Sequence, residues 1–313
     1  MADLINALST AELVEYAKNE FGEDETQMKK DVDSLLQWID KSPHLQSIRK
    51  DDAFLRVFLR GCKYSLERTK EKIDFFFTVR GSCPEFFADW NPALVNVKTV
   101  INAGIIIPLR GYDKQGRYVL LLKPGNLNPS TSKLEDLLKC NMMLTELAMR
   151  DNAQAVLKGV SIIQDMSGMT AGHASLMSAS LAKKITTIFQ DAYPNKPKAI
   201  HVLNVPGIME SLLTLMNSLQ KQKMRDRQHV HPKGDYSKLV EELGTDILPK
   251  EYGGTNGILD EHREFWKTEV VKNADWLLQQ TKYKTDESKR PGKPRSHADL
   301  FGIEGSFRKL EID

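Results

Sequence analysis

Apolar residues recur at helical spacing along the first 80 positions of the chain. Between residues 25 and 40 they fall on one face of a helix, at Met28, Val32, Leu35, Leu36 and Ile39. The stretches 51–61 and 65–80 each open with residues that favour helix entry, and the second interleaves Glu with Lys and Arg. Residues 81–93 then gather Gly, Pro, Asn and Ser around aromatic residues, which predicts a packed irregular connection. We therefore expect a helical N-terminal domain over residues 1–92.

The pattern changes after residue 105. The apolar runs IIIPL and YVLLL flank the turn GYDKQGR, which predicts a β-hairpin. Pro108 predicts that its strand lies at a sheet edge or is interrupted there. Helical stretches at 134–157, 174–189 and 208–219 then alternate with the short apolar strands GVSIIQD and AIHVLNV. Strands separated by helices of this length form parallel crossovers, and strands apolar on both alternations are covered on both faces. An α/β domain with a mixed, mainly parallel sheet and covering helices is expected over residues 93–281.

The last segment, residues 282–313, is a basic tail. Residues 282–295 hold six basic side chains against Asp286 and Glu287, a local net charge of +4, and include two prolines and a glycine. This composition predicts a mobile surface segment. The closing stretch regains apolar residues and is expected to dock on the body, through Phe301, Ile303, Phe307 and Leu310.

Composition narrows the functional classes. The 313 residues are 41% hydrophobic, enough for a sizeable core, and the net charge of +2 lacks the overall basicity of a nucleic-acid binder. Three cysteines without a CxxC pair and an acidic N-terminus without signal-peptide character indicate a reducing, cytoplasmic location. The longest charge-free apolar run, residues 99–109, is too short to span a bilayer.

No common catalytic signature is present in the chain. GxGxxG, GxxxxGK[ST] and GxSxG are all absent, and His229 and His231 lack further residues at metal-ligand spacing, so no metal or cofactor is expected. Asp165 at a strand end and His173 could form an acid–base pair, but a cap of the following turn by Asp165 is the favoured interpretation.

The helical stretch 208–219 separates polar and apolar residues completely. At about 100° per residue its apolar side chains span an arc of roughly 160°. Such a face belongs either to a core helix or to a lid over an apolar cavity, and Pro206 and Gly207 before it supply a hinge-like entry. The residues of this candidate gate are Ile208, Met209, Leu212, Leu213, Leu215, Met216 and Leu219.

Basic residues cluster around this helix. Residues 196–233 contain seven basic and two acidic side chains, a local net charge of +5. A run of charge is often only a solvated face, but next to an amphipathic helix it suits anionic headgroups, each contact contributing about 1 kcal/mol. Nucleic acid is disfavoured because no aromatic residues interleave with these charges.

Four ordered segments resemble the CRAL-TRIO family of cytosolic lipid-binding proteins. They are DDAFLRVFLRGCKYSLERT, GVSIIQDMSGMTAGH, FQDAYPNKPKAIHVLNVPGIMESLL and LPKEYGG. The resemblance implies a helical N-terminal domain, then a lipid-binding domain whose buried apolar pocket lies between a mixed sheet and a gate helix. By the same resemblance, phosphoinositide headgroups are bound by Lys196, Lys198, Lys223 and Arg227. Pro197 between the two lysines departs from the tocopherol-transfer members.

The resemblance also implies a set of residues lining the pocket. These are Leu138, Met142, Thr145, Val160, Gln164, Met177, Ile185, Ile188 and Tyr193. Thr145, Ser161 and Gln164 are the polar candidates for orienting a ligand hydroxyl or carbonyl. Gln164 replaces an aromatic residue of the tocopherol-transfer members, so tocopherol specificity does not carry over.

Three hypotheses follow from these features. The first is a monomeric, non-enzymatic cytosolic carrier of a retinoid, tocopherol or similar lipid that docks transiently on phosphoinositide membranes to load or release its cargo. The second is a phosphoinositide-sensing adaptor without lipid transfer. The third is an α/β enzyme using Asp165 and His173.

Overall fold

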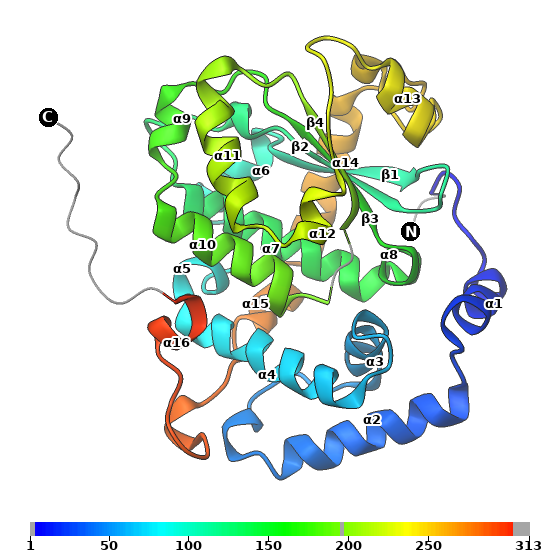
Figure 1. Cartoon of the computed structure of the whole chain (residues 1–313), viewed down its shortest axis with the longest axis vertical. Coiled ribbons are helices and arrows are strands. Elements are labelled where there is room, and N and C mark those ends of the chain that lie inside the picture. The colour runs from blue at the N-terminus through cyan, green and yellow to red at the C-terminus, as the bar shows by residue number, and fades with distance from the viewer. Residues whose placement is uncertain (1–3, 195–196, 303–313) are drawn as a thin grey trace, which may run out of the picture.

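Three N-terminal helices, α2 (Glu25–Asp40), α3 (Asp52–Gly61) and α4 (Leu66–Ser82), form a layer at the bottom of the molecule as it is drawn in Figure 1. The computed structural model describes residues 4–194 and 197–302. Its helices before the sheet are α1 (Thr10–Phe21), α2 (Glu25–Asp40), the short η1 (Pro43–Leu45), α3 (Asp52–Gly61), α4 (Leu66–Ser82), α5 (Pro84–Phe87) and α6 (Val95–Asn102). The helix α5 lies inside the connection predicted to be irregular, because Pro84 at its first turn starts a short helix. Trp90 of the same connection is fully buried, as a packed segment requires.

Five strands of the described chain form one sheet. They are β1 (Ile106–Tyr112), β2 (Tyr118–Leu122), β3 (Val160–Asp165), β4 (Pro197–Leu203) and β5 (Gln228–Val230), in the spatial order β1-β2-β3-β4-β5. The β1–β2 pair is antiparallel and every other pair is parallel. The predicted hairpin and the mixed, mainly parallel sheet are confirmed.

The edge strand β1 is interrupted after Pro108, as the sequence predicts. Pro108 pairs with Leu120, and the register then shifts before Tyr112. The carbonyl of Pro108 accepts a hydrogen bond from Trp266 Nε1 at 2.6 Å. This bond fastens a C-terminal helix to the edge of the sheet.

The crossover helices are shorter and more numerous than the periodicity predicts. The predicted helix 134–157 is divided at Asn152, whose side chain caps the second part by accepting from the amide of Ala155 at 2.8 Å. The helices between strands are α7 (Leu134–Asp151), α8 (Ala153–Lys158), α9 (Ala171–Ser175), α10 (Ala179–Thr187), η3 (Ile188–Ala192), η4 (Gly207–Met209), α11 (Glu210–Leu219) and α12 (Gln222–Arg225).

The two faces of the sheet have different covers. One face packs against α13 (Ser237–Leu243) and the loop after it, burying Val119, Leu121 and Ile163 fully. The other face lies against α7, α10 and α11. Val160 and Gln164, two of the residues predicted to line a lipid pocket, are on this second face.

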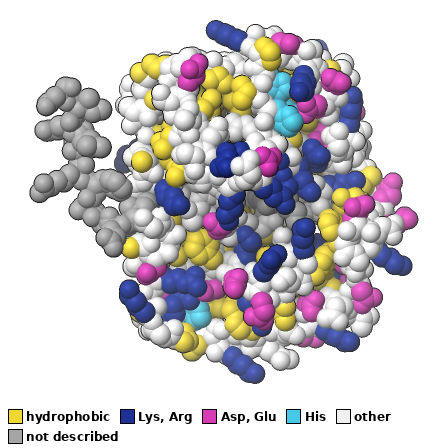
Figure 2. Space-filling view, viewed as in Figure 1, with side chains coloured by type: hydrophobic (Ala, Val, Ile, Leu, Met, Phe, Trp, Pro, Cys, Tyr) yellow, Lys and Arg dark blue, Asp and Glu magenta, His cyan; other side chains and the backbone are white. Residues whose placement is uncertain are grey.

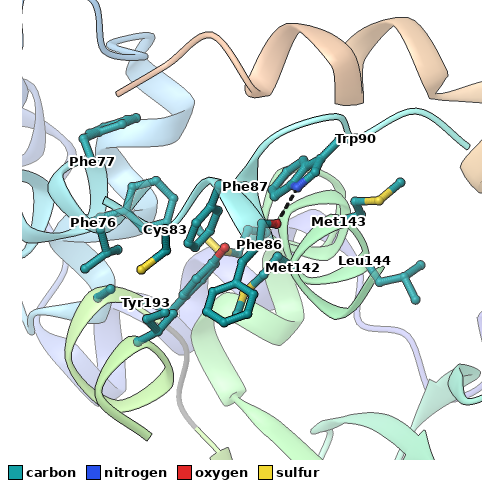
Figure 3. Close-up of a cluster of buried hydrophobic side chains, with 14 of the residues drawn as sticks. Phe76, Phe77, Cys83, Phe86, Phe87, Trp90, Met142, Met143, Leu144 and Tyr193 are labelled. Atoms are coloured by element: carbon teal, nitrogen blue, oxygen red, sulfur yellow. Dashed lines mark hydrogen bonds between the residues drawn. The ribbon is translucent and has the colours of Figure 1, made fainter. Parts of the chain in front are cut away.

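A single apolar core joins the N-terminal helices to the second face (Figure 3). Phe76 of α4 packs edge-on against Tyr193 of the segment before β4, with ring centroids 5.1 Å apart. Arg80 of α4 and Glu146 of α7 form a buried ion pair inside this core. Continuity of this core ties the predicted domains 1–92 and 93–281 together.

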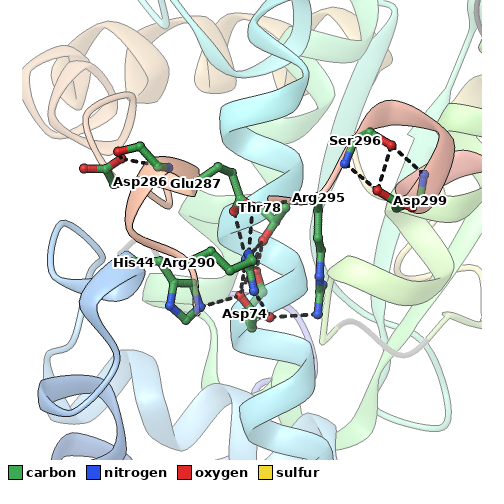
Figure 4. A network of polar contacts seen from close by, with 10 residues as sticks. His44, Asp74, Thr78, Asp286, Glu287, Arg290, Arg295, Ser296 and Asp299 are labelled. Carbon is green, nitrogen blue, oxygen red and sulfur yellow. Dashed lines mark hydrogen bonds and ion pairs between the residues drawn. The ribbon is translucent and has the colours of Figure 1, made fainter. Parts of the chain in front are cut away.

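The basic tail is anchored, which corrects the prediction of a mobile segment (Figure 4). Arg290 is half-buried and donates to Asp74 of α4 at 2.7 Å, and Arg295 pairs with the same carboxylate at 2.9 Å. A buried carboxylate needs cationic partners, and this tail supplies two of them. Phe301 is also buried, whereas Ile303, Phe307 and Leu310 lie outside the described residues. The elements of this part are α14 (Leu259–Lys272), α15 (Ala274–Gln280), η6 (Glu287–Lys289) and α16 (His297–Phe301).

Candidate functional site

The second face of the sheet is incompletely covered at its centre. On β3, Ser161, Ile163 and Asp165 are buried, while the alternate residues Val160, Ile162 and Gln164 are only half-buried. The neighbouring β2 has the same alternation, because Leu120 and Leu122 are half-buried. Leu120 pairs with Ile162, and Leu122 with Gln164, so these side chains form one continuous half-buried surface.

The helix α11 covers part of this surface without being fully buried itself. None of its residues is buried, although Leu212 and Leu213 pack against the cluster that contains Ile162. Its other apolar residues, Leu215, Met216 and Leu219, are likewise half-buried. Ile208 and Met209 precede α11 in a short 3-10 turn, where helical angles do not hold. Ile208 is accordingly exposed and Met209 buried.

The predicted pocket residues divide into two groups. Thr145, Val160, Gln164 and Met177 are half-buried, and the side chains of Thr145 and Gln164 form no hydrogen bond within the described chain. The second group consists of residues that are buried in the core, namely Leu138, Met142, Ile185, Ile188 and Tyr193.

Two polar side chains near the pocket already have partners. Tyr193 donates its hydroxyl proton to Glu146 at 3.1 Å. Ser161 is on the opposite face and donates to Asp113 at 2.6 Å, so it cannot orient a ligand on the second face. The free polar candidates on this face are Thr145 and Gln164.

Three of the four predicted headgroup residues come together, and the fourth, Lys196, lies outside the described residues. The pKa of Lys198 is lowered by burial and then by the positive charges of Arg227, Arg117, Lys223 and Lys63. Burial and Arg117 likewise lower the pKa of Arg227. We call Lys63, Arg117, Lys198, Lys223 and Arg227 the basic patch.

The basic patch has no acidic partner among the residues that the structure describes. Within residues 4–194 and 197–302, none of its members forms an ion pair with a carboxylate. Arg227 instead donates to the carbonyl of Pro197, the first residue of β4. Figure 2 shows Lys and Arg side chains gathered near the middle of the face that carries α12. Uncompensated cations of this kind attract a polyvalent anion.

Two members of the basic patch, Lys63 and Arg117, escaped the sequence analysis. Lys63 lies in the turn after α3, and Arg117 ends the hairpin loop GYDKQGR. Because β2, β3 and β4 are parallel, this loop lies at the same end of the sheet as Lys198. The basic residue in the hairpin loop could have indicated that Arg117 belongs to the patch, but only if the strand directions were known.

The structure gives Asp165 and His173 separate partners. Asp165 pairs with Lys123 at 2.9 Å and accepts from Tyr252 at 2.7 Å and from the amide of Ser167 at 3.0 Å. His173 contacts Thr170 and the carbonyl of Leu127. Although burial opposes it, a hydrogen bond from Asn204 at 2.9 Å, together with those from Tyr252, Lys123 and the amide of Ser167, lowers the pKa of Asp165 to about 2. An ionised carboxylate that caps a turn and holds Tyr252 is a structural group, in agreement with the turn-cap alternative.

Neither a metal centre nor a membrane span is found in the described part of the chain. No group of three or more His, Cys, Asp or Glu residues there has the arrangement of metal ligands. No helix in the same residues combines the length and apolarity needed to cross a bilayer.

Comparison with known proteins gives a consistent picture. Residues 102–254 match the CRAL/TRIO domain, and residues 24–97 match the Pinta-like UBA domain. The alpha-tocopherol transfer protein-like protein of Mus musculus is 32% identical over 80% of this chain and 72% of its own length. Clavesin-2 of Homo sapiens is 26% identical over 78% of this chain and 74% of its own length. The solved structure of Sfh5 shares the fold, with a TM-score of 0.53 and 16% identity over 80% of this chain and 99% of that chain.

Proposed function

This chain belongs to the CRAL-TRIO family, and from this premise we propose that it carries one hydrophobic small molecule beneath α11 and exchanges it at phosphoinositide membranes. Two parts of the molecule carry this function. The half-buried surface of β2 and β3, with α11 as its cover, binds the cargo, and the basic patch binds the membrane. In this proposal the protein is a cytosolic monomer that performs no covalent chemistry and associates with membranes transiently.

The half-buried surface at the centre of the sheet carries the proposal. Central strands of a sheet covered on both faces are normally buried on both sides. Here Leu120, Ile162 and Gln164 remain half-buried, although Leu212 and Leu213 of α11 share an apolar cluster with Ile162. A bound apolar molecule would complete this burial, contributing about 25 cal/mol for each Å² removed from water.

The helix α11 is held loosely enough to move. At its C-terminal end, Asn217 Oδ1 and Gln220 Oε1 are buried but accept no hydrogen bond in the described chain. Each such orphaned acceptor costs about 1–3 kcal/mol, so the closed position of α11 is weakly stabilised. We infer that α11 is the gate through which the cargo enters and leaves.

The gate and the basic patch are joined by a short segment. Gln220 caps the C-terminal end of α11, and Lys223 and Arg227 follow within the next seven residues. An anionic headgroup bound to these side chains therefore acts on the end of the gate. We infer that docking and opening of the gate are coupled.

Extraction of the purified full chain tests the cargo. Organic extraction and mass spectrometry should find one apolar compound per chain, and retinoids, tocopherols and phospholipids then compete for its place. Protein that holds no such compound and accepts none of these probes, while still binding phosphoinositide vesicles, would be the adaptor instead.

Vesicle binding tests the docking surface. The double variant Lys223→Ala/Arg227→Ala should bind phosphatidylinositol bisphosphate vesicles about thirtyfold more weakly, because two contacts of about 1 kcal/mol are lost. The matched control Lys30→Ala/Lys41→Ala removes two exposed lysines of the N-terminal layer and should bind like wild type. Equal binding by the patch variant and the control contradicts docking through the basic patch.

A further inference from the structure

A cavity of about 290 Å³ lies beside the basic patch, at the end of the sheet where β2 and β4 begin. Its walls include Gln115 and Arg117 of the hairpin loop, Lys198 and His201 of β4, His229 of β5 and Glu242 of α13. Its volume is at the lower end of the range for small-molecule sites. The cavity therefore fits a headgroup rather than a whole lipid.

The cavity presents two cations without anionic partners. Arg117 and Lys198 form no ion pair in the described chain. An arginine guanidinium and a lysine ammonium at one end of a cavity are suited to a phosphate group, since arginine binds phosphate in a bidentate manner.

Two histidines, His201 and His229, also line the cavity. His201 is fully buried, and its Nδ1 lies 3.1 Å from Nε2 of His231. The Nε2 of His201 has no hydrogen-bond partner in the described residues. In one ring tautomer this nitrogen donates to an oxygen of a ligand, and in the other it accepts from a hydroxyl. A buried polar atom facing a cavity in this way marks a place for a ligand group.

A carboxylate also faces the cavity. Glu242 Oε2 lies 3.9 Å from His201 Nε2, and its Oε1 lies 3.8 Å from Nδ1 of His229 and 3.9 Å from Nζ of Lys238. These distances exceed those of good hydrogen bonds, so both oxygens retain acceptor capacity. A carboxylate repels a bare inorganic anion but accepts hydrogen bonds from hydroxyl groups.

Phosphate-binding cations and a hydroxyl-accepting carboxylate together fit a phosphorylated polyol. We propose that this cavity reads the inositol phosphate headgroup of a membrane lipid, with Arg117 and Lys198 binding a phosphate and Glu242 accepting from ring hydroxyls. Gln115 and His201 complete the hydrogen bonds to the ring. This assignment rests on the proposed docking at phosphoinositide membranes and adds to it the residues that distinguish inositol lipids from other anionic lipids.

Replacing Glu242 separates two kinds of ligand, because the affinity for a bare anion and the affinity for a phosphorylated polyol should change in opposite directions. Removing a negative charge from a basic cavity strengthens the binding of a bare anion. If Glu242 instead accepts from the ring hydroxyls, Glu242→Gln weakens inositol trisphosphate binding about tenfold, the loss of a hydrogen bond to a charged group. The same variant binds inorganic phosphate as tightly as wild type or more tightly.

Isothermal titration of the full chain with inositol trisphosphate and with inorganic phosphate measures both effects. The matched control is Glu241→Gln, an exposed neighbour on α13 with the same change of charge, which should leave both affinities unchanged. Arg117→Gln should weaken both ligands. Gln115→Ala changes an exposed loop residue whose side chain holds no structural contact, and should weaken inositol trisphosphate about threefold without affecting folding.

The outcomes separate the cavity from the docking surface. Glu242→Gln protein that binds inositol trisphosphate as tightly as wild type, or wild-type protein that binds inorganic phosphate equally well, overturns the proposal. Wild-type binding to phosphatidylinositol bisphosphate vesicles that Arg117→Gln and Gln115→Ala leave unchanged also overturns it, while docking stands. Absence of vesicle binding, with inositol trisphosphate still bound in the cavity, removes the docking function alone.

Discussion

The core around α4 and the layer beneath α11 are both built from helices that pack apolar side chains, yet they are filled to different degrees. On α4 eight residues are buried, whereas on α11 none is. The polar groups differ in the same way. Arg80 and Glu146 in the core satisfy each other, while Asn217 Oδ1 and Gln220 Oε1 on α11 have no partner within the described residues. The core is complete by itself, and in the proposed function a bound apolar molecule completes the layer under α11.

Removing one large side chain from each region should show the largest difference in stability between them. Phe76→Ala should reduce the free energy of unfolding by about 4 kcal/mol, because Phe76 is buried among the rings of Phe54, Phe58, Phe77 and Tyr193. Leu212→Ala should cost delipidated protein about 1 kcal/mol or less, since its side chain is only half-buried. Urea denaturation of both variants measures the difference. Equal costs would mean that the two regions are packed alike.

Breaking the buried ion pair tests whether the core depends on its polar centre. Glu146→Gln leaves Arg80 buried without a counter-charge, and the expected loss of stability is about 3 kcal/mol. This value is at the low end because Arg80 keeps the carbonyls of Tyr283 and Gln280 as acceptors, at 3.0 and 2.6 Å. Glu241→Gln, an exposed carboxylate, is the control in the same denaturation series. A Glu146→Gln protein as stable as this control would show that the pair contributes nothing.

Releasing the docked tail should reduce the stability of the protein by a smaller amount, and this reduction should depend on pH. Burial opposes it, but hydrogen bonds from Arg290 and from the amide of Arg295 lower the pKa of Glu287 to about 2. A carboxylate with a lowered pKa stabilises the folded state above its ordinary pKa of about 4.5 and loses that contribution as the pH falls toward 2. Arg290→Ala should therefore cost about 2 kcal/mol at neutral pH and less at acid pH.

Thermal denaturation of Arg290→Ala between neutral and acid pH checks this prediction, with Lys293→Ala as the exposed control. Limited proteolysis should also cleave the tail of Arg290→Ala faster. A tail that stays protected in this variant would contradict anchoring through Asp74.

The fold was predictable because its signals are local. The alternation of helical and strand periodicities predicts parallel crossovers, and Pro108 lacks the amide that an inner strand requires, so both features could be derived from neighbouring residues. The docked tail could not be derived in this way, since it depends on Asp74 meeting Arg290 across more than 200 positions of the chain.

The candidate site was partly predictable for the same reason. The apolar arc of α11 follows from consecutive residues of the sequence, and the family resemblance predicted Lys198, Lys223 and Arg227. Arg117 and Glu242 come from a hairpin loop and from α13, and only the folded sheet brings them to one cavity. Tyr193 and Met142 show the converse limit, because apolar residues at suitable positions are buried in the core rather than free to contact a ligand.

Hydrogen exchange of the full chain, compared between delipidated protein and protein loaded from a total lipid extract, tests the central claim most directly. The account predicts that α11 exchanges much faster than α4 in delipidated protein, and that loading slows exchange in α11 and at Leu120–Leu122 while leaving α4 unchanged. If α11 exchanges as slowly as α4 before loading, and loading changes neither, the layer beneath α11 is complete without a ligand and the account is wrong.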